Sequence, residues 1–339
     1  MMTILVTGAA GFIGTNFVYY YLKKYQNRNI IGLDNLTYAG NAENFKTLSK
    51  EQQNRFKFIR GDISDPSLLK NLFNHYEIDG IINFAAESHV DRSINNSKIF
   101  IKTNVLGTHT LLESAKNSWF KEKKWLENNR FIQISTDEVY GSLGQEGYFT
   151  ETTPLDPHNP YSASKAAADL FVKAMFDTYG MNVNITRCSN NYGPYQFPEK
   201  LIPLMIHRAL AHKPLPVYGD GKQIRDWIFV EDHCRGIDFV FENGRSGEVY
   251  NIGANNEWQN INLVKLIIEI LNNETEDPDI NDNLIQYVPD RLGHDRRYAI
   301  DSLKIRTELG WLPKVSFQDG ICQTIRWYLN NQKIFGVPQ

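Results

Sequence analysis

The sequence predicts an α/β protein built on a doubly wound parallel sheet. Two observations predict this class: short apolar runs recur through the first half of the chain, and segments long enough for amphipathic helices separate them. Strands that are buried on both faces of a parallel sheet read as continuous apolar runs, and the helices between them supply the crossovers. We therefore expect strands at TILVTG, NIIGLD, FKFIRGD, GIINFAA, RFIQIST and NVNITRCS.

The character of the chain changes near Asn190, after a long predicted helix at YSASKAAADLFVKAMFDTYG. The segment that follows is rich in Pro, Gly and Tyr, although SGEVYNIG has the pattern of a strand that returns to the sheet. We therefore predict a Rossmann-type domain over residues 1–190, which the chain rejoins at about 227–253, and a smaller domain formed mainly by residues 191–339.

Composition and charge argue against several functional classes. A net charge of -3 without long blocks of like charge gives no electrostatic basis for binding nucleic acid or an anionic membrane. The sequence contains no run of about 18 apolar residues, so it predicts no membrane span. The N-terminus lacks the basic region of a signal peptide. Cys188, Cys234 and Cys322 lie far apart, and the eight histidines show no metal-ligand spacing. We expect a cytoplasmic protein without a disulfide or a metal.

A glycine-rich turn follows the first predicted strand and opens the first predicted helix, at Gly8, Gly11, Phe12, Ile13 and Gly14. Glycines let a backbone approach a pyrophosphate, and a helix N-terminus supplies free N–H groups and the positive end of a dipole. Taken alone, the motif could be an ordinary tight turn between a strand and a helix. Its position after the first strand favours a dinucleotide site.

Asp34 supports this interpretation, because it stands twenty residues after Gly14 at the end of the second predicted strand. A carboxylate there can accept hydrogen bonds from the adenosine ribose hydroxyls. It would also repel the additional phosphate of NADP, so we expect NAD to be the cofactor. Asp62, at the end of the third strand, either lies near the adenine or caps the following helix, for which Asp65 is better placed.

Tyr161 and Lys165 share one face of a predicted helix, because YSASK places them at i and i+4. Alone, such a pair is more often an ordinary aromatic and a solvated lysine. An adjacent ammonium can favour the phenolate of a tyrosine, and Thr136 at the end of a central strand could bond both Tyr161 and a substrate hydroxyl. Together these residues predict hydride transfer between an alcohol carbon and NAD. The spacing of the glycines resembles that found in the extended short-chain dehydrogenase/reductase superfamily.

Asp137 and Glu138 follow Thr136 directly in ISTDEVYG, although alcohol oxidation does not need them. Two such residues after a strand commonly form a solvated loop. In a cleft, however, two adjacent carboxylates can hold different protonation states, so that one acts as an acid and the other as a base. That chemistry suits the elimination of water.

Six stretches together resemble the dTDP-glucose 4,6-dehydratases over essentially the whole chain: DNLTYAGN, AAESHVDRS, STDEVYG, YSASK, SNNYGPYQFPEKLIP and PDRLGHDRRYAID. The resemblance implies an NAD-dependent hydro-lyase that converts dTDP-glucose into its 4-keto-6-deoxy form and water, at the start of rhamnose and other deoxysugar synthesis. Tyr161 would take the proton of the 4-hydroxyl while NAD takes the C4 hydride, and Lys165 would reach the nicotinamide ribose. Glu138 would then remove the C5 proton, Asp137 would protonate the departing C6 hydroxyl, and NADH would return its hydride to C6.

The resemblance also extends the binding sites. For NAD it adds Asn35, Leu36, Thr37, Ile63, Ala85, Ala86, Thr103 and Asn191. For the sugar nucleotide, Ser88 and Asn190 follow strand ends, while Arg225 and Arg291 either bind the diphosphate in bidentate fashion or are simply solvated. Further positions match the nucleotide-binding stretches of the family, although each alone could be packing or surface: Lys200, Leu201, Pro216, Tyr218, Asn260, His294 and Tyr298.

Similar proteins are homodimers through the helices around residues 95–117 and 161–180, so the resemblance implies a homodimer here. Three alternatives stay open at this point. The chain could be a sugar-nucleotide 4-epimerase, which typically has small uncharged residues in place of Asp137 and Glu138. It could be a dehydratase of UDP- or CDP-sugars, or it could be a regulator that binds NAD without catalysis.

Overall fold

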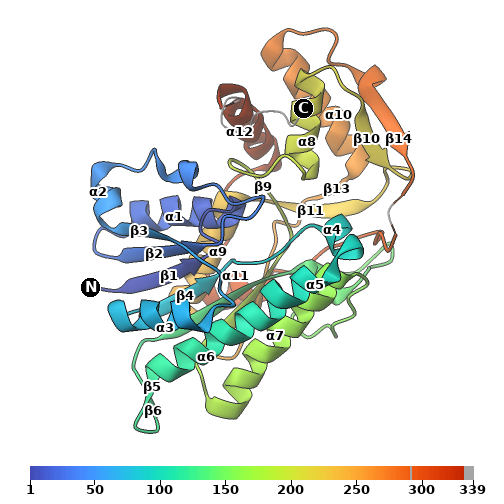
Figure 1. Ribbon diagram of the computed structural model, residues 1–339. Coiled ribbons are helices and arrows are strands. Elements are labelled where there is room, and N and C mark those ends of the chain that lie inside the picture. The colour runs from blue at the N-terminus through green and yellow to red at the C-terminus, as the bar shows by residue number, and fades with distance from the viewer. Residues whose placement is uncertain (291, 332–339) are drawn as a thin grey trace.

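The computed structural model, which describes residues 1–290 and 292–331, contains one large parallel sheet. Within the described part of the chain, its seven strands are β1 (Thr3–Thr7), β2 (Asn29–Asp34), β3 (Phe56–Arg60), β4 (Gly80–Asn83), β7 (Arg130–Thr136), β8 (Val183–Cys188) and β12 (Val249–Ile252). They lie in the order β12-β8-β7-β4-β1-β2-β3 (Figure 1). The strand order reverses between β1 and β4, and doubly wound folds bind ligands at the carboxyl ends of the strands there. The predicted fold class is confirmed.

Helices cover both faces of this sheet. The first face packs against α1 (Phe12–Lys24), α9 (Val230–Asn243) and α11 (Leu303–Leu309), and the second packs against α3 (Pro66–His75), α6 (Thr108–Trp119) and α7 (Pro160–Tyr179). Successive strand residues point to opposite faces, so Ile4 and Val6 of β1 join the first core while Leu5 joins the second. No helix among the described residues is long and apolar enough to cross a membrane.

A second lobe with its own core follows β8 in the sequence and is drawn above the main sheet in Figure 1. It consists of β9 (Asn190–Tyr192), α8 (Leu201–Leu210), β10 (Leu215–Tyr218), β11 (Ile224–Phe229), β13 (Glu257–Gln259), α10 (Asn260–Thr275), η4 (Asp282–Leu284), β14 (Ile285–Val288) and α12 (Phe317–Asn330). Strand β11 pairs with β9 on one side and β13 on the other, while β10 pairs with β14.

The remaining elements lie in the connections between the strands of the main sheet. They are η1 (Ala42–Phe45), α2 (Lys50–Asn54), α4 (Val90–Asn95), α5 (Ser97–Phe100), η2 (Ile101–Gly107), β5 (Phe120–Lys121), β6 (Lys124–Trp125) and η3 (Asp137–Tyr140). Segment η2 is π-helical, and it positions Asn104 in a buried site. The Asn104 side-chain amide accepts from the Glu87 backbone N–H at 2.8 Å and donates to the Glu87 carbonyl at 3.0 Å. It also donates to the Ser164 hydroxyl at 2.8 Å. It thereby joins the loop after β4 to helix α7.

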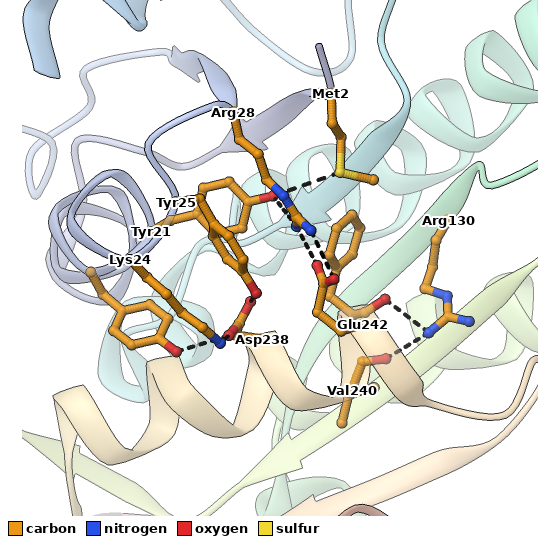
Figure 2. Close-up of polar contacts among 11 residues, drawn as sticks. Met2, Tyr21, Lys24, Tyr25, Arg28, Arg130, Asp238, Val240 and Glu242 are labelled. Carbon is orange, nitrogen blue, oxygen red and sulfur yellow. Dashed lines mark hydrogen bonds and ion pairs between the residues drawn. The ribbon is translucent and has the colours of Figure 1, made fainter.

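Polar contacts fasten α1 to α9 across the first core (Figure 2). The Asp238 side chain is fully buried, and it accepts hydrogen bonds from the Tyr20 hydroxyl at 2.8 Å and the Tyr25 hydroxyl at 3.1 Å. Lys24 forms an ion pair with the same carboxylate. A buried charge is tolerated only with such partners. This carboxylate ties two residues of α1, Tyr20 and Lys24, and its C-cap residue Tyr25 to one position of α9.

The chain returns to the main sheet after it has begun the second lobe. Helix α9 packs beside α1, and β12 then pairs in parallel with β8 at the edge of the sheet. The Arg130 guanidinium of β7 donates to the carbonyl oxygens of Val240 at 2.8 Å and Phe241 at 2.9 Å, near the end of α9 (Figure 2). The early strands therefore depend on residues from the later part of the sequence.

Candidate active site

A cavity of about 310 Å³ lies at the carboxyl edge of the main sheet, where the strand order reverses. Its walls come from the residues that follow β1, β2, β3, β4, β7 and β8, together with the first turn of α7 and the segment after β9. A cavity in this position is the usual ligand site of a doubly wound fold. Nearly all of the predicted cofactor residues line it.

The turn after β1 fits a pyrophosphate. Gly8 has a φ of +65°, and a Cβ atom there would lie 2.7 Å from the Ala85 nitrogen. A Cβ atom on Gly14 would lie 2.2 Å from the Gly8 oxygen, so neither position accepts a side chain. Gly11 is the N-cap of α1 and supplies no side-chain acceptor, which leaves the N–H groups of the first turn for a bound anion.

Asp34 lies at the end of β2 beside this turn. Its carboxylate accepts hydrogen bonds from the backbone N–H groups of Ala10 at 3.0 Å and Leu36 at 2.8 Å. Burial raises the pKa of Asp34, while those hydrogen bonds act in the opposite direction. The residue therefore both supports the glycine turn and exposes a carboxylate to the cavity, as an adenosine ribose requires.

Asp62 lies in the loop after β3 and does not cap a helix. Its carboxylate accepts from the Ser64 backbone and hydroxyl, each at 2.8 Å, and from Lys102 at 3.1 Å. The cap of α3 is Asp65, as the sequence indicates. Of the predicted cofactor residues, those that line the cavity are Gly8, Gly11, Phe12, Ile13, Gly14, Asp34, Asn35, Thr37, Asp62, Ile63, Ala85, Ala86, Thr103, Tyr161, Lys165 and Asn191. Leu36 instead packs against the first core.

The predicted catalytic residues come together at the end of β7. Thr136 caps the short helix η3, because its hydroxyl accepts from the Glu138 N–H at 3.2 Å. The same hydroxyl lies 3.3 Å from Oδ1 of Asp137. Helix α7 begins at Pro160 with an Asn159 capping box, so Tyr161 stands in its first turn. The five predicted catalytic residues therefore border one cavity: Thr136, Asp137, Glu138, Tyr161 and Lys165.

Asp137 is in an environment that favours the protonated acid. It is 2% exposed, and burial, the Glu138 charge and the Asp226 charge raise its pKa well above the ordinary value. Arg225 and the Thr136 hydroxyl act in the opposite direction without reversing the shift. Within the described part of the chain, Oδ2 of Asp137 has no hydrogen-bond partner. A buried carboxyl that retains its proton can donate it to a leaving group.

Tyr161 is held as a neutral phenol by the protein alone. Burial and the Glu138 charge raise its pKa well above the ordinary value, and a hydrogen bond with Thr136 opposes them. Burial also lowers the pKa of Lys165, whose Nζ atom donates to the Ile134 carbonyl at 2.6 Å. Burial therefore disfavours the charged form of both side chains.

The predicted substrate residues divide into two sets. Ser88, Asn190 and Lys200 line the cavity together with Thr136, and Lys200 donates to the Ser88 carbonyl at 2.8 Å. The second set lies outside the cavity lining. Leu201, Pro216, Tyr218, Arg225 and Asn260 belong to elements of the second lobe, whereas His294 and Tyr298 lie in the segment between β14 and α11. Arg291 lies outside the described residues.

Arg225 shows why this second set could not be placed from the sequence. It is 8% exposed, and its guanidinium donates to the Asp295 carbonyl at 3.0 Å and lies 4.2 Å from the centre of the Tyr298 ring. It therefore faces protein groups rather than open solvent. Tyr218 and His294 also meet each other, edge to face, with ring centres 6.3 Å apart.

Several cavity residues were missed by the sequence reasoning. They include two acidic side chains, Glu87 and Glu199, and also Phe197, Gln196 and Cys188. The first two stand inside AAESHVDRS and SNNYGPYQFPEKLIP, so the motifs that carried the resemblance contained the signal. In the described residues, no group of three or more His, Cys, Asp or Glu side chains could hold a metal ion.

Comparison with known proteins agrees with this geometry. A family model described as GDP-mannose 4,6 dehydratase matches residues 5–324. A dTDP-glucose 4,6-dehydratase of Xanthomonas campestris is 52% identical over 98% of this chain and 94% of its own length. One from Escherichia coli is 50% identical over 98% of this chain and 95% of its own.

Solved structures give the same result. DesIV, a dTDP-glucose 4,6-dehydratase from Streptomyces venezuelae whose crystal structure has NAD and TYD bound, superposes with a TM-score of 0.90. It is 45% identical, and the match covers 99% of both chains. The chain therefore belongs to the dTDP-glucose 4,6-dehydratases, within the wider family that the GDP-mannose 4,6 dehydratase model describes.

Proposed function

We propose that this protein binds NAD and converts dTDP-glucose into dTDP-4-keto-6-deoxyglucose and water. One observation carries the proposal: a buried carboxyl that favours its protonated form, Asp137, stands next to Glu138 and borders the same cavity as the glycine turn and Tyr161. Oxidation at C4 does not need that pair, whereas elimination of water needs an acid and a base. The family of the chain supports the same reaction.

The residues of the cavity suit NAD in shape and charge. Gly8 and Gly14 leave the backbone open to the pyrophosphate, and Asp34 presents its carboxylate where the adenosine ribose would lie. A second negative group at that ribose would be repelled by Asp34, so NADP fits less well. When bound, NAD supplies the acceptor for the C4 hydride and later returns the same hydride to C6.

In the first step, we assign Tyr161 as the base that takes the proton of the sugar 4-hydroxyl. Thr136 holds that hydroxyl in place, since its own hydroxyl lies beside both Tyr161 and Asp137. The protein alone keeps Tyr161 protonated, so it becomes a base only beside a positive charge such as that of an oxidised nicotinamide ring. Lys165 fixes the arrangement through its hydrogen bond to Ile134.

In the second step, the new C4 ketone acidifies the C5 proton. We assign Glu138 as the base that takes it and Asp137 as the acid that gives its proton to the departing C6 hydroxyl, which leaves as water. The proton held by Glu138 returns to C5 as C6 is reduced. Glu138 is restored by that return, and the proton that Tyr161 took from the 4-hydroxyl replaces the one that Asp137 gave to the departing water, so no atom of the protein is consumed.

The sugar nucleotide would extend from this point towards the second lobe. Ser88, Asn190 and Lys200 are the predicted substrate residues that border the cavity, and we propose that they bond the sugar or the diphosphate. Arg225 and Tyr298 lie outside its lining. The thymidine contacts proposed for the other lobe residues remain a prediction from the resemblance.

We also propose that the protein is a homodimer. Apolar side chains are exposed on α4, α5, η2 and α7, which are neighbours (Figure 1): Ile94, Ile99, Ile101, Leu106, Leu170 and Phe171. A shared apolar face of this kind commonly marks an interface. Replacing Leu170 by Glu should yield a monomer in size-exclusion chromatography with light scattering. The replacement Leu312→Glu, at another exposed leucine outside this face, should leave the oligomer unchanged.

We place the protein in the cytoplasm. Its cysteines Cys188, Cys234 and Cys322 are all free, and two of them are buried. Unpaired thiols are typical of a reducing compartment.

One labelling experiment tests the reaction. Deuterium at C4 of dTDP-glucose should appear at C6 of the same product molecule, because one hydride is removed and returned within one site. An epimerase would leave the label at C4, and a regulator would move nothing. Parallel incubations with UDP-, CDP- and GDP-glucose, followed by the alkali absorbance of the 4-keto product, identify the preferred nucleotide.

A further inference from the structure

A fully buried histidine, His233, lies against one of the residues that border the cavity. It stands near the start of α9, and its side chain is 0% exposed. Its Nδ1 atom lies 2.8 Å from Oδ1 of Asn191, a residue of β9 in the cavity lining. None of the proposed reaction steps uses His233, so its role has to be sought in this contact.

The fold holds His233 and Asn191 together. Strand β11 pairs in parallel with β9, where Ile228 lies opposite Asn191, and helix α9 follows β11 directly. The start of α9 is anchored by Asp232, whose buried carboxylate accepts from the Val315 backbone N–H at 2.8 Å. His233 therefore stands on a fixed helix rather than on a loop.

The partners of the Asn191 carboxamide decide which of its atoms faces the histidine. Its Nδ2 atom donates to the Ser189 carbonyl at 3.0 Å, and a carbonyl oxygen can only accept. The Oδ1 atom therefore faces His233, and because this oxygen also only accepts, the histidine proton is on Nδ1. Among the described residues, Nε2 of His233 has no hydrogen-bond partner, which agrees with a bare acceptor there. Burial lowers the pKa of His233 to about 3, so the ring is neutral.

With its oxygen held by His233, the Asn191 carboxamide turns its amino group towards the end of β8. Cys188, the last residue of β8, pairs with Thr136 of β7, so this is the catalytic end of the cavity rather than the end at the glycine turn. Burial raises the pKa of the Cys188 thiol to about 12, and a hydrogen bond from Asn191 acts in the opposite direction. A thiol is only a weak acceptor, so an oxygen of a bound cofactor can compete for the same N–H. Asn191 is therefore suited to the nicotinamide end of NAD.

We propose that His233 is a positioning residue for the cofactor: its Nδ1–H group fixes the Asn191 carboxamide so that the Asn191 amino group donates to the nicotinamide end of NAD. The inference rests on the proposed function, because it requires NAD in this cavity. Without the Nδ1 donor, the carboxamide would be free to rotate, and its oxygen would then repel the acceptor atom of the ligand. A histidine that served only as packing would act through its volume instead.

Two replacements of His233 separate the loss of the donor from the loss of volume. The side-chain nitrogen of asparagine occupies the same place relative to Cβ as Nδ1 of histidine, so His233→Asn keeps the donor although it leaves more empty space. Glutamine fills more of that space, but its nitrogen takes the place of Nε2, so His233→Gln loses the donor to Asn191. The control is His207→Gln, because His207 is also buried, at 4% exposed, and lies outside the cavity lining. Its Nε2 atom likewise meets no partner in the described part of the chain.

Calorimetric titration with NAD and, separately, with ADP-ribose measures the effect, because ADP-ribose lacks only the nicotinamide. We expect His233→Gln to weaken NAD binding about three- to tenfold, the range for one lost hydrogen bond, and to leave ADP-ribose within about twofold of the parent. His233→Asn and His207→Gln should bind both ligands as the parent does. The double variant His233→Gln/Asn191→Ala should bind NAD no more weakly than Asn191→Ala alone, because both changes act through one carboxamide.

Nitrogen NMR of the histidine-labelled parent protein gives a second measurement, which holds even where a variant fails to fold. The His233 ring should be the neutral Nδ1–H tautomer at neutral pH, and the Nε2–H tautomer would overturn the proposal. Equal weakening of NAD and ADP-ribose by His233→Gln would overturn it too, as would weaker NAD binding by His233→Asn than by His233→Gln. A parent protein that does not bind NAD refutes the proposed function itself, whereas a parent that binds NAD while His233→Gln matches it refutes only the positioning role.

Discussion

Replacing Asp137 by Asn should make the protein more stable while it disables elimination. Asparagine has nearly the shape of a protonated aspartic acid but cannot give up a proton as an acid. Burial and two neighbouring carboxylates raise the pKa of Asp137 well above its value in an unfolded chain. The folded protein therefore binds a proton that the unfolded chain releases, which destabilises the parent at neutral pH.

The size of this effect follows from proton linkage. Above the unfolded pKa of about 3.9, the parent should lose about 1.4 kcal/mol of stability per pH unit relative to Asp137→Asn, until the pH reaches the folded pKa. Below that pH range the folded and the unfolded parent both bind the proton, so this contribution to the stability difference between the parent and Asp137→Asn should vanish. General acid catalysis contributes about 10²–10⁴-fold in rate, so elimination should fall by that factor while C4 oxidation persists.

Urea unfolding of the two proteins without cofactor, measured at several pH values, tests the stability, and the decay of bound NADH tests the chemistry. Asp177→Asn is a suitable control, because Asp177 forms an exposed ion pair with Lys173 at 2.7 Å. This control substitution should lower the free energy of unfolding by no more than about 0.5 kcal/mol at neutral pH. A stability difference for Asp137→Asn that does not grow with pH, or a parental elimination rate, would refute the reasoning.

Three further substitutions probe other parts of the molecule. Gly14→Ala should abolish NAD binding in calorimetry, because the added Cβ would lie 2.2 Å from the Gly8 oxygen; retained affinity would contradict the pyrophosphate assignment. Tyr161→Phe should bind NAD normally and lose at least about 10²-fold in C4 oxidation, measured as the rise of bound NADH, and equal turnover would remove it from the mechanism. Asp238→Ala should destabilise the fold by about 1–3 kcal/mol in urea without changing NAD affinity, because two tyrosine hydroxyls lose their buried acceptor and the partly exposed Lys24 loses its ion pair (Figure 2). A loss under about 1 kcal/mol would contradict that account.

The sequence predicted the strands well because their signal is local. NIIGLD and RFIQIST match β2 and β7 residue for residue, since a buried parallel strand needs only a continuous apolar run. The glycine turn and the Tyr161–Lys165 pair were found for the same reason: each lies within one short motif on one element. Helix α7 likewise begins within one residue of the predicted start.

The parts that escaped prediction depend on contacts between distant segments. The π-helical turn at η2 shows no periodicity of its own and is held by the bonds of Asn104 to Glu87 and Ser164. Asp226 of β11 raises the pKa of Asp137 only because the fold brings the two carboxyl groups within electrostatic reach, and no sequence pattern relates the two positions. Arg225 was considered as a phosphate ligand or a solvated side chain, and its partners are backbone carbonyls.

The late return of the chain to the sheet governs how this protein can be made and divided. Strand β12 and helix α9 are synthesised after the second lobe has begun, yet one closes an edge of the main sheet and the other covers a face of it. A nascent chain that stops at Cys188 would have an open β8 edge and an exposed apolar layer on its early strands. The cofactor half should therefore not be obtainable as a stable fragment, nor should it fold on the ribosome before about three quarters of the protein has emerged. Chimeras with relatives would have to exchange both segments together.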